Sequence, residues 1–266
     1  MPIRRINGIN LSFESHGRGE PVLLIPGTGA RGTIFRAHQV PALLGAGYRA
    51  VTVDNRGMAP SDLCEEGFTL ADVVADAAAL IEELGCGPCR VVGFSMGSLV
   101  AQELMLARPD LVRQAVLMAT RGRTDPLSRA HTAGELDLID QGTKLSPRYA
   151  AAMRVYQSFS PGTLADEKAV LNWLDLFEMS IEAGAPSRAQ VMLDQFTDRL
   201  AAYRAITTPA LVLAFADDML APAHLGREVA DAIPGGQFRV IAECGHFGFV
   251  EKPAAVNATM IDFFAR

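Results

Sequence analysis

The sequence predicts an α/β protein with a mostly parallel central sheet flanked by helices and with an inserted helical cap. Strand-like and helix-like stretches alternate over most of the chain, which is typical of parallel strands joined by crossover helices. Between about residues 121 and 207 the alternation stops, and helical stretches follow one another without a convincing strand. The 266 residues, 49% hydrophobic and 20% charged, suffice for one sizeable core. We therefore predict a core made of residues 1–120 and 208–266 and a cap made of residues 121–207.

The first part of the core begins with a hairpin signal. Asn7-Gly8 stands between two short strand-like stretches, and this dipeptide favours the two-residue turn of an antiparallel hairpin. The stretches that follow alternate between short buried strands and longer amphipathic helices. Strands are predicted at residues 21–25, 49–54, 90–94 and 114–119, and helices at residues 69–84 and 96–107.

Glycine and proline residues divide the cap into separate helical segments, after which the alternating pattern resumes. Cap helices are predicted at residues 126–140, 147–159, 167–180 and 188–206. The last part of the core is predicted to contain strands at residues 210–215 and 237–241 and helices at residues 222–233 and 253–265. No apolar run approaches the roughly 18 residues that span a bilayer, and no secretion signal follows Arg4-Arg5, so we expect a soluble, cytoplasmic protein.

Charge and cysteine content argue against several classes of function. The 24 basic and 30 acidic residues are interspersed and give a formal net charge of −6, so nothing predicts binding to nucleic acid or to a membrane. Cys86-Gly87-Pro88-Cys89 has the spacing of a redox motif, but it follows a predicted helix instead of beginning one. No cluster of potential ligands has metal-binding spacing, so we predict no metal and no cofactor.

The pentapeptide Gly93-Phe94-Ser95-Met96-Gly97 lies between a predicted strand and a predicted helix and matches the Gly-x-Ser-x-Gly nucleophile elbow. Such a turn projects the serine hydroxyl above the sheet, and side chains at the glycine positions would collide with the neighbouring strand and helix. Backbone N–H groups at the helix N-terminus, including that of Met96, can stabilise an oxyanion. We therefore predict that Ser95 is a nucleophile.

A serine nucleophile needs a base that takes its proton and an acid that orients the base. His246 follows the last predicted strand, and Asp217 and Asp218 follow the strand before it. Because the carboxyl ends of parallel strands meet at one edge of a sheet, these side chains should lie near Ser95. The chain order serine, aspartate, histidine is also the order that a nucleophile elbow predicts.

These residues resemble the α/β-hydrolase superfamily over nearly the whole chain. The segment from Asp54 to Ser61 is similar to the family's Asp-x-Arg-Gly-x-Gly-x-Ser loop, and residues 245–253 are similar to its Gly-His-x4-Glu-x-Pro ending. Residues 215–222 resemble its Gly-x-x-Asp-x-x-x-Pro acid motif, with phenylalanine in place of the glycine. The Asp-to-Pro spacing selects Asp218, while Asp217 stays open, and Asp125 stands where some family members place the acid.

The resemblance implies an oxyanion hole and a reaction. Pro26-Gly27-Thr28-Gly29 stands where the family has its His-Gly-x loop, so the backbone N–H groups of Thr28 and Met96 are the implied donors. A serine hydrolase that cleaves an ester, thioester or lactone through Ser95, His246 and Asp218 is the implied activity. C–C hydrolases, perhydrolases, cyclases and ligand receptors share the fold and stay open as alternatives.

A competing motif overlaps the same loop. Gly27-x-Gly29-x-x-Gly32 follows a predicted strand, and Asp54 ends the next strand, as in a dinucleotide-binding fingerprint. A nicotinamide-dependent oxidoreductase would leave Ser95 and His246 without a role. The hydrolase interpretation explains these residues and the glycines together, and we favour it.

The resemblance also implies that the cap shapes the substrate pocket. Its apolar side chains favour a small-to-medium hydrophobic substrate, although helices bury apolar faces in any case. Beyond a small-molecule substrate the sequence indicates no partner, and a homodimer stays open. The candidate substrate-binding residues are Phe35, His38, Met153, Phe159, Trp173, Phe177 and Phe247.

Overall fold

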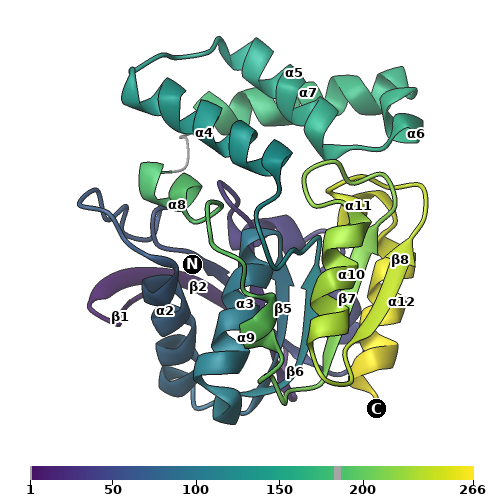
Figure 1. The fold of residues 1–266 in the computed structure, drawn as a ribbon. Coiled ribbons are helices and arrows are strands. Elements are labelled where there is room, and N and C mark those ends of the chain that lie inside the picture. Colours follow the sequence, from purple (N-terminus) through teal and green to yellow (C-terminus); the bar gives the residue numbers. More distant parts are fainter. Residues whose placement is uncertain (1, 183–186) are drawn as a thin grey trace.

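The structure, a computed structural model, describes residues 2–182 and 187–266 and has the predicted α/β architecture (Figure 1). Residues 183–186 of the predicted cap lie outside the described residues. The described chain forms an eight-stranded sheet in the order β1-β2-β4-β3-β5-β6-β7-β8. β2 pairs antiparallel with β1 and with β4, and the remaining neighbours are parallel. The strands are β1 (Ile3–Ile6), β2 (Ile9–His16), β3 (Pro21–Ile25), β4 (Arg49–Asp54), β5 (Cys89–Phe94), β6 (Val112–Met118), β7 (Ala210–Phe215) and β8 (Gln237–Ile241).

Helices cover both faces of this sheet, because successive strand residues point to opposite faces and both sets are apolar. Leu23 and Ile25 of β3 belong to a core cluster with α2, α3 and α10, whereas Val22 and Leu24 belong to a second cluster with α1 and α12. None of the described helices combines the length and apolar character needed to cross a membrane. The helices around the sheet are α1 (Gln39–Gly45), α2 (Leu70–Glu83), α3 (Met96–Ala107), α9 (Leu200–Tyr203), α10 (Ala223–Ala232), α11 (Gly248–Glu251) and α12 (Pro253–Phe264), with 3-10 turns η1 (Gly32–Phe35) and η2 (Pro109–Leu111).

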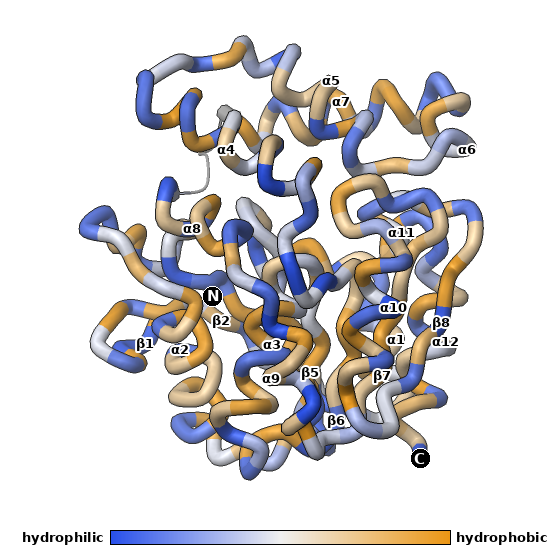
Figure 2. Tube along the Cα trace, in the orientation of Figure 1, coloured by the Kyte–Doolittle hydropathy of each residue, from blue (hydrophilic) through white to orange (hydrophobic). Residues whose placement is uncertain are grey.

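Helices α4 to α8, between β6 and β7 in the chain, lie above the carboxyl ends of the strands (Figure 1). We call them the upper helical layer. Hydrophobic and hydrophilic positions alternate along α5 and α7 (Figure 2), and these two helices pack together around Val155 and Phe177. The layer consists of α4 (Pro126–Asp140), α5 (Pro147–Ser158), α6 (Pro161–Leu164), α7 (Glu167–Glu182) and α8 (Arg188–Met192).

The expectation of one helix over residues 188–206 is wrong, because the segment forms two short helices, α8 and α9. Between them, the carbonyl oxygens of Asp194 and Phe196 accept hydrogen bonds from the Thr124 hydroxyl at 3.4 and 3.0 Å. The Arg199 N–H donates to the Gly122 carbonyl at 2.8 Å. Contacts with the start of the insertion therefore replace helical hydrogen bonds, and tertiary structure overrides a local helical preference.

Candidate active site

Ser95 occupies the sharp turn between β5 and α3. Its φ of 53° and ψ of −119° lie in a sparsely populated region that costs an L residue about 1–3 kcal/mol. The flanking glycines permit the turn, since a Cβ on Gly97 would lie 2.1 Å from the Ile25 carbonyl oxygen and one on Gly93 would lie 2.4 Å from the Gly97 carbonyl oxygen. The pentapeptide thus has the strand–turn–helix context of a nucleophile elbow.

His246 and Asp218 form a buried pair at the same edge of the sheet. They belong to the loops that follow β8 and β7, and His246 Nδ1 lies 2.8 Å from Asp218 Oδ2. The other carboxylate oxygen, Oδ1, accepts hydrogen bonds from the backbone N–H groups of Leu220 and Ala221 at 2.9 and 2.8 Å. These bonds fix the orientation of the carboxylate and stabilise its charge. A proton on Nδ1, shared with the carboxylate, leaves Nε2 of the imidazole as an acceptor.

The two other acid candidates have different surroundings. Asp125 is the N-cap of α4 and accepts a hydrogen bond from the Ser128 N–H at 2.7 Å. The Asp217 side chain lines a separate cleft of about 500 Å³, together with Glu243, Lys252 and residues of α6. The geometry therefore assigns the contact with the imidazole to Asp218, the residue that the motif spacing selects.

Aromatic rings connect the imidazole to the serine turn and to the upper helical layer. The ring centroid of Phe94, which precedes Ser95, lies 5.0 Å from that of His246 and 5.4 Å from that of Phe247. Phe247 in turn contacts Phe159 and Phe177 at 5.9 and 6.0 Å. We call these four phenylalanines, Phe94, Phe159, Phe177 and Phe247, the aromatic wall.

The remaining predicted substrate-binding residues lie in different places. Trp173 packs on the aromatic wall, with its ring centroid 4.7 Å from that of Phe159. Phe35 is fully buried in the core, where its ring lies 5.7 Å from that of Phe249. His38 is half-buried immediately before α1, and Met153 is exposed on α5.

The loop after β3 passes beside the serine turn, since a Cβ on Gly27 would lie 3.1 Å from the Ser95 Cβ. Two side chains from the end of the helical insertion hold this loop. The Thr28 hydroxyl donates to Asp194 Oδ2, and the Gly29 N–H donates to Gln190 Oε1, both at 2.8 Å. In the part of the chain that the structure describes, no group accepts a hydrogen bond from the backbone N–H of Thr28.

Arg121, three residues after the end of β6, places a charged group near Ser95. It donates to Asp194 Oδ1 at 3.1 Å and to the carbonyl oxygens of Asp194 and Leu220 at 3.2 and 3.3 Å. Its buried Nε has no hydrogen-bond partner within residues 2–182 and 187–266. A crevice too narrow to hold a water molecule lies beside the nucleophile candidate and is lined by Ser95, Leu99, Ala119, Arg121 and Asp194. Ser95 therefore adjoins a charged pair, Arg121 and Asp194, and follows the aromatic residue Phe94 in the chain.

Sequence reasoning missed Arg121, Gln190 and Asp194. The place of Arg121 just beyond a predicted strand could have marked it, because ligands bind at the carboxyl ends of parallel strands. Gln190 and Asp194 carry no such signal, since they lie in a segment with a helical pattern. Their contacts with the loop after β3 depend on the position of α8 relative to the sheet.

Glu251 connects the loop that carries His246 to the upper helical layer. Its Oε2 accepts a hydrogen bond from the Gly245 N–H at 2.6 Å. Its Oε1 accepts three more, from the N–H and hydroxyl of Ser160 at 3.1 and 2.7 Å and from the Thr163 hydroxyl at 2.6 Å. One carboxylate thereby fixes both the residue before His246 and the start of α6.

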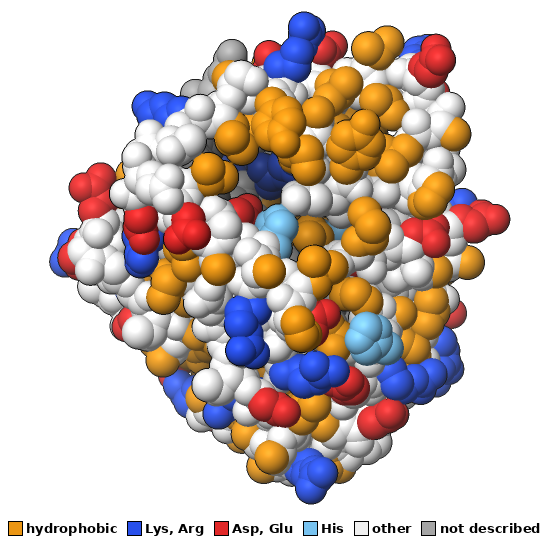
Figure 3. Space-filling model, turned by 45° about the horizontal axis from the view of Figure 1, so that its top comes forward, with side chains coloured by type: hydrophobic (Ala, Val, Ile, Leu, Met, Phe, Trp, Pro, Cys, Tyr) orange, Lys and Arg blue, Asp and Glu red, His pale blue; other side chains and the backbone are white. Residues whose placement is uncertain are grey.

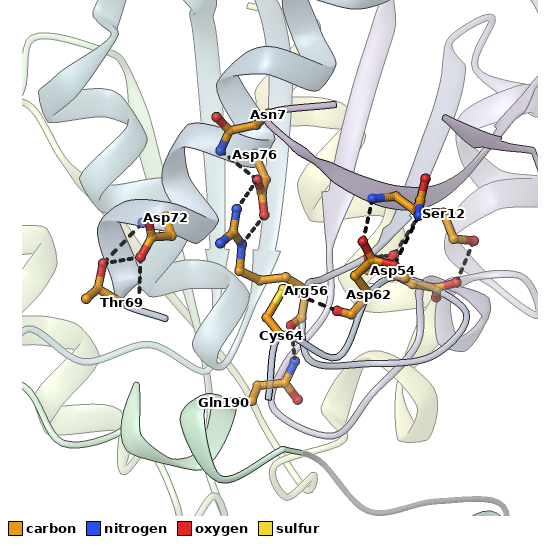
Figure 4. A network of polar contacts seen from close by, with 12 residues as sticks. Asn7, Ser12, Asp54, Arg56, Asp62, Cys64, Thr69, Asp72, Asp76 and Gln190 are labelled. Carbon is orange, nitrogen blue, oxygen red and sulfur yellow. Dashed lines mark hydrogen bonds and ion pairs between the residues drawn. The ribbon is translucent and has the colours of Figure 1, made fainter. Parts of the chain in front are cut away.

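Asp54 takes part in the network of polar contacts in Figure 4, and these contacts argue against a dinucleotide-binding site. Asp54 would have to bind a ribose, but its carboxylate is buried and accepts hydrogen bonds from the Gly32 N–H at 2.9 Å and the Ser12 hydroxyl at 3.0 Å. Burial raises the pKa of the Asp54 carboxyl. In the same network Gln190 Nε2 donates to the Arg56 carbonyl at 3.2 Å, so this loop too is tied to α8. The Asp54 carboxylate therefore stabilises the buried loop after β3, and the geometry does not support a dinucleotide-binding site.

The strand order and the serine turn after β5 define a protein of the α/β-hydrolase class. The chain belongs to the alpha/beta hydrolase family, whose model matches residues 22–259. The fold and the family that the sequence predicts are both confirmed.

Several named proteins are similar to this chain. "Putative non-heme bromoperoxidase BpoC" of Mycobacterium tuberculosis is 49% identical over 258 residues, which are 97% of this chain and 98% of that protein. Its crystal structure superposes with a TM-score of 0.91 at 47% identity and covers 97% of this chain and 96% of that one. "Putative carbamate hydrolase RutD" of Variovorax paradoxus is 29% identical over 96% of each chain. A thermophilic esterase from Thermogutta terrifontis has a TM-score of 0.86 at 25% identity and covers 100% of this chain and 98% of that one.

Proposed function

We propose that the protein is a serine hydrolase that cleaves an ester, thioester or lactone bond of a small-to-medium substrate. The observation that carries this proposal is the 2.8 Å hydrogen bond between His246 and Asp218 at the sheet edge where strained Ser95 stands. Relatives named as hydrolases and as an esterase support the reaction class.

In the proposed mechanism, His246 Nε2 takes the proton of the Ser95 hydroxyl as Oγ attacks the carbonyl carbon. Asp218 holds the imidazole in the required tautomer and stabilises the imidazolium that forms. The backbone N–H groups of Thr28 and Met96 donate to the oxyanion of the tetrahedral intermediate. Protonation by His246 releases the alcohol, thiol or ring oxygen, and water then resolves the acyl-enzyme by the same steps.

The upper helical layer serves as the cap of this site in our proposal. The aromatic wall suits an apolar part of the substrate, as the sequence leads us to expect. Arg121 and Asp194, however, are paired beside Ser95, so the part of the substrate nearest the carbonyl should lie close to charged groups. We therefore propose an amphipathic substrate in place of a purely hydrophobic one.

Labelling with a fluorophosphonate probe tests the proposal. The probe should modify Ser95 of the wild-type protein, and neither Ser95→Ala nor wild-type protein denatured beforehand should be labelled. A panel of aryl esters, thioesters and lactones then identifies the bond that is cleaved. Absence of labelling, or turnover that survives Ser95→Ala, would overturn the mechanism.

A second candidate function is perhydrolysis, which the name of the 49% identical relative favours. Hydrogen peroxide would replace water in attacking the acyl-Ser95 carbonyl, giving a peroxy acid and the free hydroxyl of Ser95. The peroxy acid would transfer its outer oxygen to bromide, yielding hypobromite and the carboxylic acid. Bromination of a diketone dye in acetate, peroxide and bromide, absent in Ser95→Ala, would identify this activity.

A further inference from the structure

Charged side chains of the upper helical layer lie close to one another, since Glu135 interacts electrostatically with His131, Arg154 and Asp194. Arg154 on α5 holds its guanidinium carbon 5.2 Å from the ring centroid of Phe177. Phe177 contacts Phe247, and the ring of Phe247 lies next to the imidazole of His246. Two phenylalanine rings, Phe177 and Phe247, therefore stand between the guanidinium and the imidazole. Figure 3 shows a hollow beneath the hydrophobic surface of the layer, with a basic side chain and a histidine on its walls.

The charges in this region pair with one another, except for Arg154. Arg121 is bound to Asp194 at 3.1 Å, and His131 Nδ1 lies 3.5 Å from Glu135 on α4. No carboxylate among the described residues lies within 4.0 Å of the Arg154 guanidinium, although Glu135 attracts it at longer range. Partial burial lowers the pKa of Arg154, whereas the Glu135 side chain is half exposed to solvent. An arginine stays charged nonetheless, so this cation lacks a close partner.

We propose that Arg154 binds a carboxylate of the substrate, at a position remote from the carbonyl that Ser95 attacks. This inference rests on the proposed hydrolase function and names its substrate class, the esters or lactones that bear a carboxylic acid. The planar guanidinium matches a carboxylate in a bidentate hydrogen bond. The carboxylates of Glu135 and Asp194 near the same space disfavour a dianionic phosphate, and the aromatic wall packs against the apolar segment between carboxylate and ester.

Paired substrates that differ only in one charge test the proposal. On the acyl side, 4-nitrophenyl monoesters of adipate and pimelate are compared with the same compounds capped as methyl esters. On the leaving-group side, acetates of 3- and 4-hydroxybenzoate are compared with the acetates of their methyl esters. The readout is the ratio of kcat/KM for acid over capped substrate in the wild type, Arg154→Gln and Arg154→Lys. Arg148→Gln, an exposed arginine on the same helix, is the matched control.

In at least one series we expect the wild type and Arg148→Gln to prefer the acid about tenfold or more, the value of one hydrogen-bonded charge pair. Arg154→Gln should lose that preference, mainly through KM, and Arg154→Lys should retain part of it. A wild type that prefers the capped esters in both series, or an Arg154→Gln variant that slows both substrates equally, overturns the proposal.

Fluorophosphonate labelling of Ser95 separates the two possible failures. Labelling of a wild-type protein that shows no preference for the acid leaves the hydrolase function standing and removes the carboxylate site. If Ser95 is not labelled, the hydrolase function fails, and the site is judged by adipate alone. Adipate should then raise the melting temperature of the wild type but not of Arg154→Gln, and an equal effect on both proteins counts against the site.

Discussion

Replacing Gln190 with alanine tests how far the loop beside Ser95 depends on α8. The side chain is fully buried, accepts a hydrogen bond from the Gly29 N–H at 2.8 Å and donates one to the Arg56 carbonyl at 3.2 Å. The variant leaves two backbone groups without these partners, at about 1–3 kcal/mol each, and a small void adds about 1 kcal/mol. We expect the free energy of unfolding in urea to fall by about 3–7 kcal/mol.

The same substitution should impair turnover. Gly29 adjoins Thr28, the proposed oxyanion donor, so a shift of the loop weakens a hydrogen bond that matters most in the transition state. Complete loss of such a donor costs about 10²–10³ in kcat, and a displaced donor should cost less, about 10–100-fold, with a smaller change in KM. Steady-state kinetics with 4-nitrophenyl acetate measures both constants.

Two variants serve as controls for Gln190→Ala. Gln195→Ala removes an exposed glutamine from the same segment and should change neither stability nor rate. Gln190→Glu keeps an acceptor for Gly29 but places a carboxylate oxygen against the Arg56 carbonyl, so it should recover more of kcat than of stability. A destabilised Gln190→Ala protein with wild-type kcat would refute the link between α8 and the proposed oxyanion donor Thr28.

Three further predictions follow from the site and the core. Asp218→Asn should lower kcat by roughly 10³–10⁴-fold while circular dichroism shows the fold retained, because an amide supports the wrong tautomer of His246. Gly97→Ala should lower the free energy of unfolding by at least about 3 kcal/mol, measured in urea, because its Cβ would lie 2.1 Å from the Ile25 carbonyl oxygen. The hydrogen bond from Arg90 holds the pKa of Glu20 below its ordinary value, so Glu20→Gln should destabilise the protein at pH 7 by at most about 1 kcal/mol, since Glu20 is half exposed. That difference should disappear as the pH falls below 4.5 through the lowered pKa of the folded state, as urea unfolding at several pH values would show.

Each of these expectations can fail in a distinct way. An Asp218→Asn enzyme with near-wild-type kcat would mean that another acid orients the imidazole. A Gly97→Ala protein as stable as the wild type would show that the strand and helix can separate at little cost. A Glu20→Gln difference that grows in acid would contradict the direction of the pKa shift.

The fold and the positions of three residues of the candidate site could be predicted because their signals are local. The Asn7-Gly8 turn, the apolar strands and the Ser95 pentapeptide each act through neighbours in the chain, and all appear in the structure as expected. His246 and Asp218 lie 28 residues apart, but each follows a predicted strand, so the topology of a parallel sheet brings them together.

The contacts of the helical insertion could not be predicted in the same way. Asp194 meets Thr28 across 166 residues, and the contact requires the chain to leave a helix where the local pattern favours one. Arg154 and Glu135 look like members of a solvated helix face in the sequence. Only the packing of α4 and α5 above the sheet brings these two side chains close enough to interact.

The upper helical layer is fastened to the sheet at two places. Glu251 holds the start of α6, while Gln190 and Asp194 hold the segment around α8. Lifting the whole layer would break hydrogen bonds at both ends, each worth about 0.5–1.5 kcal/mol and more where a charge takes part. Rotation of side chains around the hollow costs less. If the layer is the proposed cap, these hydrogen bonds keep it in a fixed position over the site, and removing either set should let it move and admit larger substrates.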